Sequence, residues 1–437
     1  MLKKLCKVIF FVFLVLVSSK LACFSAPVYD YEHGRFELLT PAPPYLPDDP
    51  QYVMQTEDGH VYFIDENSNI IEFKPKTNTF EKLARLDHCS VGRVAPTRAI
   101  LLRNGKILLV SPITTLTSDK FKYEFEKIIR NNKIPGIRGL TFSNRVDNFY
   151  LKMSEIERIS ALLPYIKKNP NLYKRYMEYA HCFNESMYGQ IFDPVTRTFE
   201  KTGKVNIRRH VLSKVLLSDN RVLLFRGYED EDEPDPFEIF DPDTQKFTLL
   251  DETLHGNGGG ATNKILLNNG NVLITTYREV FIFDPYSVHL DKVSSSVNMA
   301  SNAIKLHGKK DIIIYRDWFT DKLKRYDVEK NTATDLGEFL INRGFGHSGW
   351  LSLLPDNNIM VSGGHNDERE VLEHKSDIPE SRVELIYTKT GQIKLIPSRT
   401  NDEFYLLKPL VLKDGRIVFW FRKNTEIYIP KGYDRNN

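Results

Sequence analysis

Cysteine and tryptophan are scarce in this chain, with 4 and 3 copies among 437 residues. So few cysteines exclude the small disulfide-dense scaffolds, which depend on many crosslinks. Long apolar runs are also lacking. The longest, Val8–Val17, has ten residues, and a membrane-spanning helix needs about 20. We therefore expect no membrane span.

An excess of one charge sign is lacking as well. Lys and Arg number 60 and Asp and Glu 57, for a formal charge of +3. Four of the lysines lie in the first 26 residues, so a chain without that segment carries 3 − 4 = −1. A protein whose main partner is a nucleic acid normally has a strongly basic surface. We therefore expect no nucleic-acid partner.

The common catalytic motifs are missing too. The sequence contains no GxSxG elbow, no HExxH pair and no phosphate-binding P-loop. The acidic stretch 227–237 lacks the glycine spacing of a calcium loop, and His365 and His374 have no recognisable ligand spacing. We therefore assign no catalytic residue, no metal and no cofactor.

A β-hairpin pattern is what the chain does contain, and it occurs seven times. The clearest copy lies in 343–364, where two apolar runs flank Asp356-Asn357. Two β-prone runs joined by a tight Asn, Asp or Gly turn are the strongest short-range hairpin signal. The other copies are 51–65, 98–111, 214–227, 264–277, 303–316 and 409–421.

A strand–turn–strand element follows the hairpins, as in EIFDPDTQKFTLL (238–250). Its Asp-Pro step suits a type I turn, because Pro presets φ and Asp caps the turn. The repeat unit therefore has four strands and returns about every 40–58 residues, apart from one large insertion, as propeller blades do. The first copy, 28–39, matches only the back half of the unit. We expect it to complete the last blade, which gives an all-β, seven-bladed β-propeller closed by the N-terminal strand.

The repeat resembles the kelch motif of kelch proteins and of the central domain of galactose oxidase. The residues that carry the resemblance are Arg343, His347, Asp356-Asn357 and Gly363-Gly364, with Asp241-Pro242, Thr244 and Phe247 in a neighbouring blade. Arg209-His210 stands nine residues before Asp219, as His347 does before Asp356. The resemblance implies a kelch-type propeller. The two Arg/His pairs are interpreted as residues that hydrogen-bond between blades.

Residues 1–26 have the pattern of an export signal. Lysines precede the apolar run Val8–Val17, and small residues follow it. We expect cleavage between Ala22 and Ala26 and a mature propeller over 27–437, located in the periplasm, outside the cell or on its surface. An alternative is a lipid anchor at Cys23, although Lys20 stands where a lipobox has a large apolar residue.

A segment of different texture, 113–187, interrupts the second blade. Its apolar residues recur at helical spacing, and Ser154 with Glu157 forms a capping box. We expect a small helical insertion on one propeller face. Propeller geometry places Cys89 and Cys182 on that same face of one blade. A disulfide between them is one hypothesis, and two buried free cysteines are the alternative.

These observations favour a non-catalytic binding module for a protein or glycan partner. Loops and inner strands that converge on one face would form the recognition surface. The candidate ligand-binding residues are Arg98, His210, Asn263, Asn302, His347 and Lys408 at the starts of inner strands, with Tyr173 and Tyr176 on the insertion. The alternative function is a carbohydrate-active enzyme, an oxidase, epimerase or lyase, on a kelch propeller.

Overall fold

The computed structural model describes most strands, the turns between them and a few helical residues. The described ranges are 29–39, 53–65, 69–86, 98–110, 163–171, 173–174, 177, 187–207, 213–225, 235–254, 263–276, 279–293, 297, 299, 302–317, 320, 322–341, 349–363, 382–399, 408–420 and 425–433. The export signal predicted over 1–26 lies outside these ranges, as does most of the insertion predicted over 113–187.

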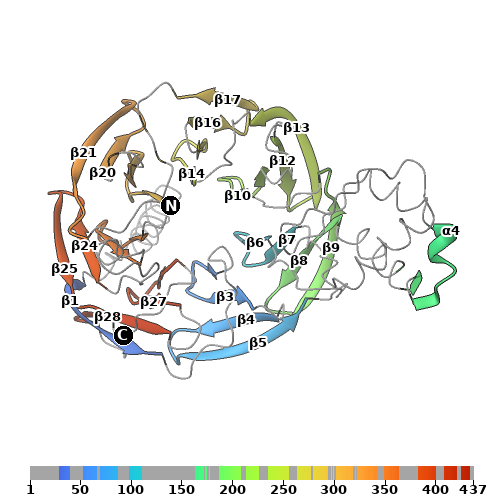
Figure 1. Cartoon of the computed structure of the whole chain (residues 1–437), viewed down its shortest axis with the longest axis horizontal. Coiled ribbons are helices and arrows are strands. Elements are labelled where there is room, and N and C mark those ends of the chain that lie inside the picture. The colour runs from blue at the N-terminus through green and yellow to red at the C-terminus, as the bar shows by residue number, and fades with distance from the viewer. Residues whose placement is uncertain are drawn as a thin grey trace, which may run out of the picture.

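Seven antiparallel four-stranded sheets form the blades of a ring, which confirms the predicted seven-bladed β-propeller (Figure 1). Blade 1 contains β2 (Met54–Gln55), β3 (Val61–Ile64), β4 (Asn69–Lys74) and β5 (Thr79–Arg85). Blade 2 contains β6 (Arg98–Leu101), β7 (Ile107–Val110), β8 (Tyr188–Asp193) and β9 (Thr198–Lys204). Blade 3 contains β10 (Ser213–Leu216), β11 (Val222–Phe225), β12 (Asp235–Asp241) and β13 (Lys246–Leu254). Blade 4 contains β14 (Asn263–Leu266), β15 (Val272–Thr275), β16 (Val280–Asp284) and β17 (His289–Lys292). Blade 5 contains β18 (Ala303–Lys305), β19 (Ile312–Arg316), β20 (Lys322–Asp327) and β21 (Thr332–Glu338). Blade 6 contains β22 (Trp350–Leu353), β23 (Ile359–Ser362), β24 (Val383–Tyr387) and β25 (Gln392–Ile396). Blade 7 contains β26 (Leu410–Val411), β27 (Ile417–Phe419), β28 (Glu426–Lys431) and β1 (Asp30–Leu38).

The position of a strand within its blade follows from its sequence. In the order given above for each blade, the first strand lies nearest the axis and the fourth lies at the rim (Figure 1). Second strands such as β7 and β11 are unbroken apolar runs and are buried at every residue. Such runs are typical of strands covered on both faces. Rim strands such as β17 consist of exposed and half-buried residues, because one face meets solvent.

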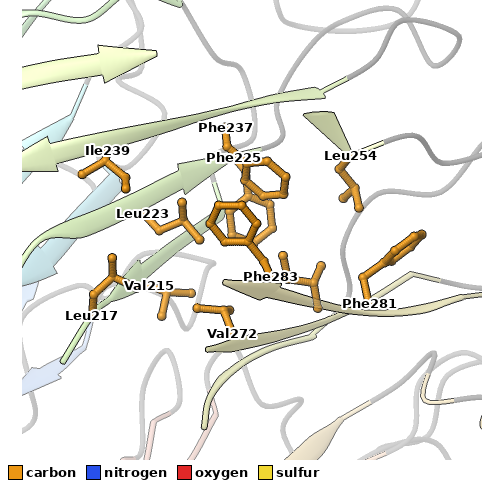
Figure 2. Packing of buried hydrophobic residues seen from close by; sticks show 11 residues of the cluster. Val215, Leu217, Leu223, Phe225, Phe237, Ile239, Leu254, Val272, Phe281 and Phe283 are labelled. Atoms are coloured by element: carbon orange, nitrogen blue, oxygen red, sulfur yellow. The ribbon is translucent and has the colours of Figure 1, made fainter. Parts of the chain in front are cut away.

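The hydrophobic core lies between neighbouring blades. Figure 2 shows one cluster, in which Phe225 and Phe237 of blade 3 pack against Phe283 of blade 4. The rings of Phe237 and Phe283 are stacked with their centroids 4.4 Å apart. Burying one such side chain contributes about 2–3 kcal/mol. Because every core cluster is shared, a blade cannot bury its faces without its neighbours, and the fold depends on a complete ring.

The ring is closed by a strand from the start of the chain. β1 pairs with β28 in an antiparallel register that includes Phe36 opposite Tyr428, as expected for the half-repeat 28–39. Glu32 of β1 accepts hydrogen bonds from Lys394 Nζ at 2.8 Å and from the Tyr387 hydroxyl at 2.7 Å. Both partners belong to blade 6, so β1 joins the last two blades as well as completing one of them.

Asparagine and aspartate side chains join neighbouring hairpin turns on one face of the ring. The Asn357 side chain accepts a hydrogen bond from the His307 backbone N–H and donates one to the His307 carbonyl. The backbone N–H of Asn268 donates to the carboxylate of Asp311 at 3.0 Å. These bonds link blade 5 to blades 6 and 4. We call this side, which carries the turns between first and second strands, the turn face.

The Asp-Pro turns have the geometry that the sequence predicts. Asp241 Oδ1 accepts the backbone N–H of Asp243 at 2.9 Å, and Asp284 Oδ1 accepts that of Tyr286 at 2.8 Å. The next strand then begins after a residue with positive φ, Gln245 in one turn and Val288 in the other. Positive φ is unusual for a β-branched residue, so the Val288 turn carries backbone strain.

Helix α4 (Leu163–Ile166) lies within the insertion between β7 and β8, and residues 170–171, 173–174 and 177 of the insertion are helical too. It is drawn beside blade 2 at the edge of Figure 1. The rest of the predicted helical insertion lies outside the described residues, so its cap-like arrangement stays a prediction. Within the described ranges, no helix is long and apolar enough to span a bilayer.

Candidate functional site at the starts of the inner strands

The face opposite the turn face carries the first residues of all the inner strands, and we call it the start face. Neighbouring inner strands contact each other around the ring, for example β10 with β14 and β14 with β18. Antiparallel order within each blade also places the connections between second and third strands on the start face. The insertion and the candidate residues on strand starts therefore belong to one side of the molecule.

Three candidate residues lie at equivalent places on this face. Asn263 opens β14, Asn302 stands directly before β18, and Lys408 stands two residues before β26. Arg98 opens β6, and its backbone is described. Tyr173 is half-buried next to helix α4. His210, His347, Tyr176, Cys89 and Cys182 lie outside the described residues, and their predicted roles stay predictions.

Asn263 joins two blades through its side-chain amide. Its Nδ2 donates to Thr275 Oγ1 at 3.0 Å within blade 4 and to the Met299 carbonyl at 2.8 Å. Its Oδ1 accepts the backbone N–H of Ala303, the first residue of β18 in blade 5, at 3.0 Å. Both ends of the amide are thus engaged in holding the inner strands together.

Asn302 repeats this arrangement one blade further on. Its Nδ2 donates to the carbonyl of Gly349, directly before β22 of blade 6, at 2.9 Å. A hydrogen bond between blades is the role that the sequence suggested for the two Arg/His pairs. The structure shows that role at two asparagines. An Asn at the strand start of two successive blades, 39 residues apart (302 − 263), is the signal that would have found it.

Lys408 differs from the asparagines because its side chain is exposed. Within the described ranges it forms no hydrogen bond and no ion pair. Although solvent reaches it, the surrounding protein desolvates it, and this desolvation lowers the pKa of the Lys408 ammonium below its ordinary value. Lys408 is thus an exposed cation just before an inner strand.

Trp420 lies beside Lys408 on the next strand out. The register of β26 and β27, with Leu410 opposite Val418, places residue 408 opposite residue 420 when it is continued outward. Trp420 is fully buried, and its ring packs edge-on against Phe73 at 6.0 Å. Its indole N–H has no acceptor within the described part of the chain. Such buried donors are normally satisfied by an ordered water.

Buried glutamates on third strands anchor the segments that lead to the candidate histidines. Glu384 of β24 accepts the backbone N–H groups of Leu340 at 2.6 Å and Ile341 at 3.2 Å. Glu238 of β12 accepts the backbone N–H and the side-chain amide of Asn206, at 2.7 and 2.9 Å. Each segment then runs on towards His347 or His210. Sequence reasoning missed these residues, although a single Glu within an apolar third strand is visible in both blades.

Acidic and basic groups at the end of β19 and in the strand after it form a second fixed cluster on the start face. Arg316 ends β19 and lies over the ring of Phe339, with 5.6 Å between guanidinium carbon and ring centroid. Asp317 accepts the Thr320 hydroxyl at 2.9 Å and lies 3.1 Å from Lys324 Nζ. Burial alone would raise the pKa of Asp317, but these partners outweigh it and leave the pKa below its ordinary value.

No group of three His, Cys, Asp or Glu side chains that could hold a metal occurs among the residues that the structure describes. His365, His374 and residues 227–234 of the acidic stretch lie outside them.

Comparison with known proteins supports the propeller fold and assigns no function to the chain. No protein-family model matches the chain, and no curated protein does. A streptogramin B lyase structure aligns with 92% of this chain and 100% of its own, with a TM-score of 0.55 and 8% identity. A fungal alcohol oxidase of the AA5 family, in complex with copper, aligns with 91% of this chain and 76% of its own, with a TM-score of 0.56 and 12% identity. At such low identity the likeness concerns the propeller fold alone.

Proposed function

We propose that the chain is a kelch-type propeller that is exported and acts as a non-catalytic binding module. Its partner is a protein or a glycan, and the binding surface is the start face. The proposal combines the kelch-like residues of the sequence with the propeller fold. The AA5 oxidase supports the fold part of this statement only.

One observation carries the proposal, namely that the long connections between described strands lie on the start face, while other connections there, such as 65–68, and those on the turn face are short. On the start face, residues 111–187 connect β7 to β8 and residues 363–382 connect β23 to β24. On the turn face, residues 217–221 and 242–245 are enough to connect their strands. Loops displayed by a rigid scaffold are where binding residues concentrate.

The described contacts also supply a rigid base for those loops. Asn263 and Asn302 tie inner strands together, and Glu238 and Glu384 fix the segments that approach the start face. Preorganised surfaces lose less conformational entropy when a partner binds. A recognition surface benefits from this arrangement.

A binding experiment with two engineered variants tests the proposal. Residues 27–437 would be immobilised and probed with a glycan panel and with proteins of the envelope and host surface. In one variant a short Gly/Ser linker replaces 113–187, and in the matched control the same linker is inserted at 242–245 on the turn face. We expect the first variant to lose the partner and the second to keep it, with circular dichroism showing that both fold.

The enzymatic alternative gives a different result in the same samples. An oxidase, epimerase or lyase would convert an oligosaccharide of the panel, which product analysis by mass spectrometry detects. Metal analysis of natively purified protein separates a copper enzyme further. Turnover of any bound glycan, or binding that is unchanged when 113–187 is removed, would contradict the proposal.

Export is tested at the new N-terminus. We expect protein recovered from the periplasm or the medium to begin between Cys23 and Pro27, as the signal pattern of 1–26 predicts. An N-terminal Cys23 carrying a fatty-acyl mass would instead place the protein on the cell surface by a lipid anchor. Recovery of the intact chain from the cytoplasm would contradict export.

A further inference from the structure

The inner hairpin turn of blade 1, residues 56–60 on the turn face, carries an aspartate and a histidine side by side. The backbone N–H of Thr56 donates to the His60 carbonyl at 2.9 Å, and Gly59 completes the turn with a φ of +93°. Asp58 stands at the tip, and His60 directly precedes β3. Both side chains are exposed, and His60 Nε2 lies 3.6 Å from Asp58 Oδ2. This gap is longer than a hydrogen bond.

A direct hydrogen bond closes the same two turn positions in blades 3 and 7, where arginine stands in place of the histidine. Arg221 Nε donates to Asp219 Oδ2 at 2.8 Å, and Arg416 Nε donates to Asp414 Oδ2 at 3.0 Å. In blade 1 the two polar atoms lie near each other without such a bond. An ion placed between them could contact both.

The imidazole of His60 is oriented by a carboxylate on its other nitrogen. Glu72 of β4, whose side chain is 10% exposed, has its Oε1 2.5 Å from His60 Nδ1. This contact favours a proton on Nδ1 and leaves a lone pair on Nε2, the nitrogen nearer the aspartate. His33 and His289 differ, because each contacts one aspartate directly, at 2.9 and 3.0 Å, and no second carboxylate in the part of the chain that the structure describes.

The Asp58 carboxylate is fixed through its other oxygen. The Thr56 hydroxyl donates to Asp58 Oδ1, and this bond lowers the pKa of the carboxyl. The carboxylate is therefore ionised at neutral pH, with Oδ2 as the oxygen nearer His60. The turn thus holds a nitrogen and an oxygen donor close together, each oriented by a neighbouring side chain.

The charges around this turn are mixed. Lys74 Nζ lies 3.8 Å from Glu72 but 2.6 Å from Glu81, so it pairs more closely with Glu81. Lys413 of blade 7 packs its stem beside Gly59, since a Cβ built on the glycine would lie 3.8 Å from the Cβ of Lys413. The placement of the two donor atoms, and not an excess of negative charge, is what favours a metal ion here.

We propose that His60 Nε2 and Asp58 Oδ2 bind a zinc ion on the turn face, with water in its remaining positions. Zinc holds nitrogen and oxygen ligands at about 2.0–2.2 Å, so two ligands of a tetrahedral ion lie about 3.3 Å apart, close to the observed gap. Glu72 takes the place of the outer carboxylate that orients most metal-binding histidines. The described residues contain no group of three side chains that could hold a metal, so water supplies the other ligands.

Isothermal titration with zinc chloride tests the site on protein without a histidine tag and stripped with a chelator. We expect the parent to bind one zinc ion that His60→Gln does not bind, because the ligand nitrogen is gone. Glu72→Gln should weaken this binding about tenfold, since the amide orients the imidazole less firmly than the carboxylate does. Magnesium should not compete, because it prefers oxygen ligands to imidazole.

His289→Gln is the matched control, because His289 is also exposed and faces an aspartate but lacks the second carboxylate. It should bind zinc as the parent does. Thermal unfolding checks that every variant folds, and it gives a second readout. Zinc should raise the Tm of the parent and of His289→Gln, and should leave that of His60→Gln unchanged, because only a folded site that binds the ion is stabilised by it.

Three outcomes would overturn the inference. A parent that takes up no zinc at up to about 1 mM would remove the site. A zinc isotherm of His60→Gln that matches the parent would place any bound ion elsewhere in the chain. Equal weakening by His289→Gln would mean adventitious binding to surface imidazoles only. Each outcome leaves the proposed binding function standing, because that function belongs to the start face.

Discussion

Glu384 accepts a hydrogen bond from the backbone N–H of Leu340 at 2.6 Å, across the boundary between blades 5 and 6. The glutamate is fully buried on β24, and its partner lies just after the rim strand β21. The bond therefore fixes the point at which the chain leaves one blade for the next. Glu238 accepts a backbone hydrogen bond from the equivalent segment before blade 3, so the same kind of contact occurs at two blade boundaries.

Removing this carboxylate should destabilise the ring. In Glu384→Ala, two buried backbone N–H groups lose their acceptor, and we expect a loss of about 3 kcal/mol in the free energy of unfolding. Glu384→Gln keeps an acceptor oxygen without the charge and should lose about 1 kcal/mol. Urea unfolding measures both values. The control is Glu338→Ala, since the Glu338 side chain is 75% exposed and pairs only with exposed Lys322, so at most about 0.5 kcal/mol is expected. Equal effects at 384 and 338 would contradict the anchoring role.

The closing strand should be sensitive to a single methyl group at Gly34. A Cβ built there would lie 2.5 Å from the Tyr428 hydroxyl and 2.6 Å from the Ile429 carbonyl. Tyr428 is fully buried and also receives the Gly34 N–H, so it has little room to move. We expect Gly34→Ala to lower the free energy of unfolding by about 2 kcal/mol or more.

Gly432→Ala is the control for the closing strand. Gly432 has a φ of +88° and no atom within 4 Å of an added Cβ, so only the backbone cost of about 1 kcal/mol applies. Urea unfolding compares the two variants. A Gly34→Ala protein as stable as the Gly432→Ala protein would mean that β1 can shift away from β28 at little cost.

The blade repeat could be predicted from the sequence because its signals are local. Each hairpin combines apolar runs with a turn such as Asp356-Asn357, and Asn357 indeed has positive φ. The half-repeat 28–39 was recognisable for the same reason, and the structure pairs it with β28. Such features depend on residues close together in the chain, so one sequence is enough to find them.

The contacts between blades could not be predicted because their partners are distant in the chain. Asn263 and Ala303 are 40 residues apart, and Glu384 and Leu340 are 44 apart. Which polar residue meets which backbone group depends on how successive blades are rotated, and no local pattern encodes that. The structure shows such contacts at Asn263 and Asn302. The inter-blade role expected for Arg209-His210 and for Arg343 with His347 lies outside the described residues and stays a prediction.

Stability should depend on the ionised form of Asp317 at acid pH. The pKa of Asp317 is lowered in the folded protein, where Thr320 and Lys324 stabilise the carboxylate. Its contribution is therefore complete above the unfolded pKa of about 3.9 and is lost as pH falls through the lower, folded value. We expect Asp317→Asn to be about 2 kcal/mol less stable than the parent at pH 7, with the difference shrinking below about pH 4.

Thermal or urea unfolding between about pH 3 and 7 measures this difference. Asp243→Asn is the control, because Asp243 is exposed on an Asp-Pro turn and its side chain has no described partner. Its stability should follow the parent at every pH. A pH-independent deficit in Asp317→Asn would assign the loss to packing and not to the charged hydrogen bonds.

Lys408 should be acylated faster than other exposed lysines. Its lowered pKa increases the fraction of neutral amine at a given pH, and the neutral amine is the nucleophile. The amine nitrogen attacks the carbonyl of acetic anhydride, acetate leaves, and the amine loses a proton to solvent. Limiting anhydride at about pH 8, followed by peptide mass spectrometry, compares Lys408 with Lys309. Equal rates at the two lysines would show that surrounding protein does not desolvate Lys408.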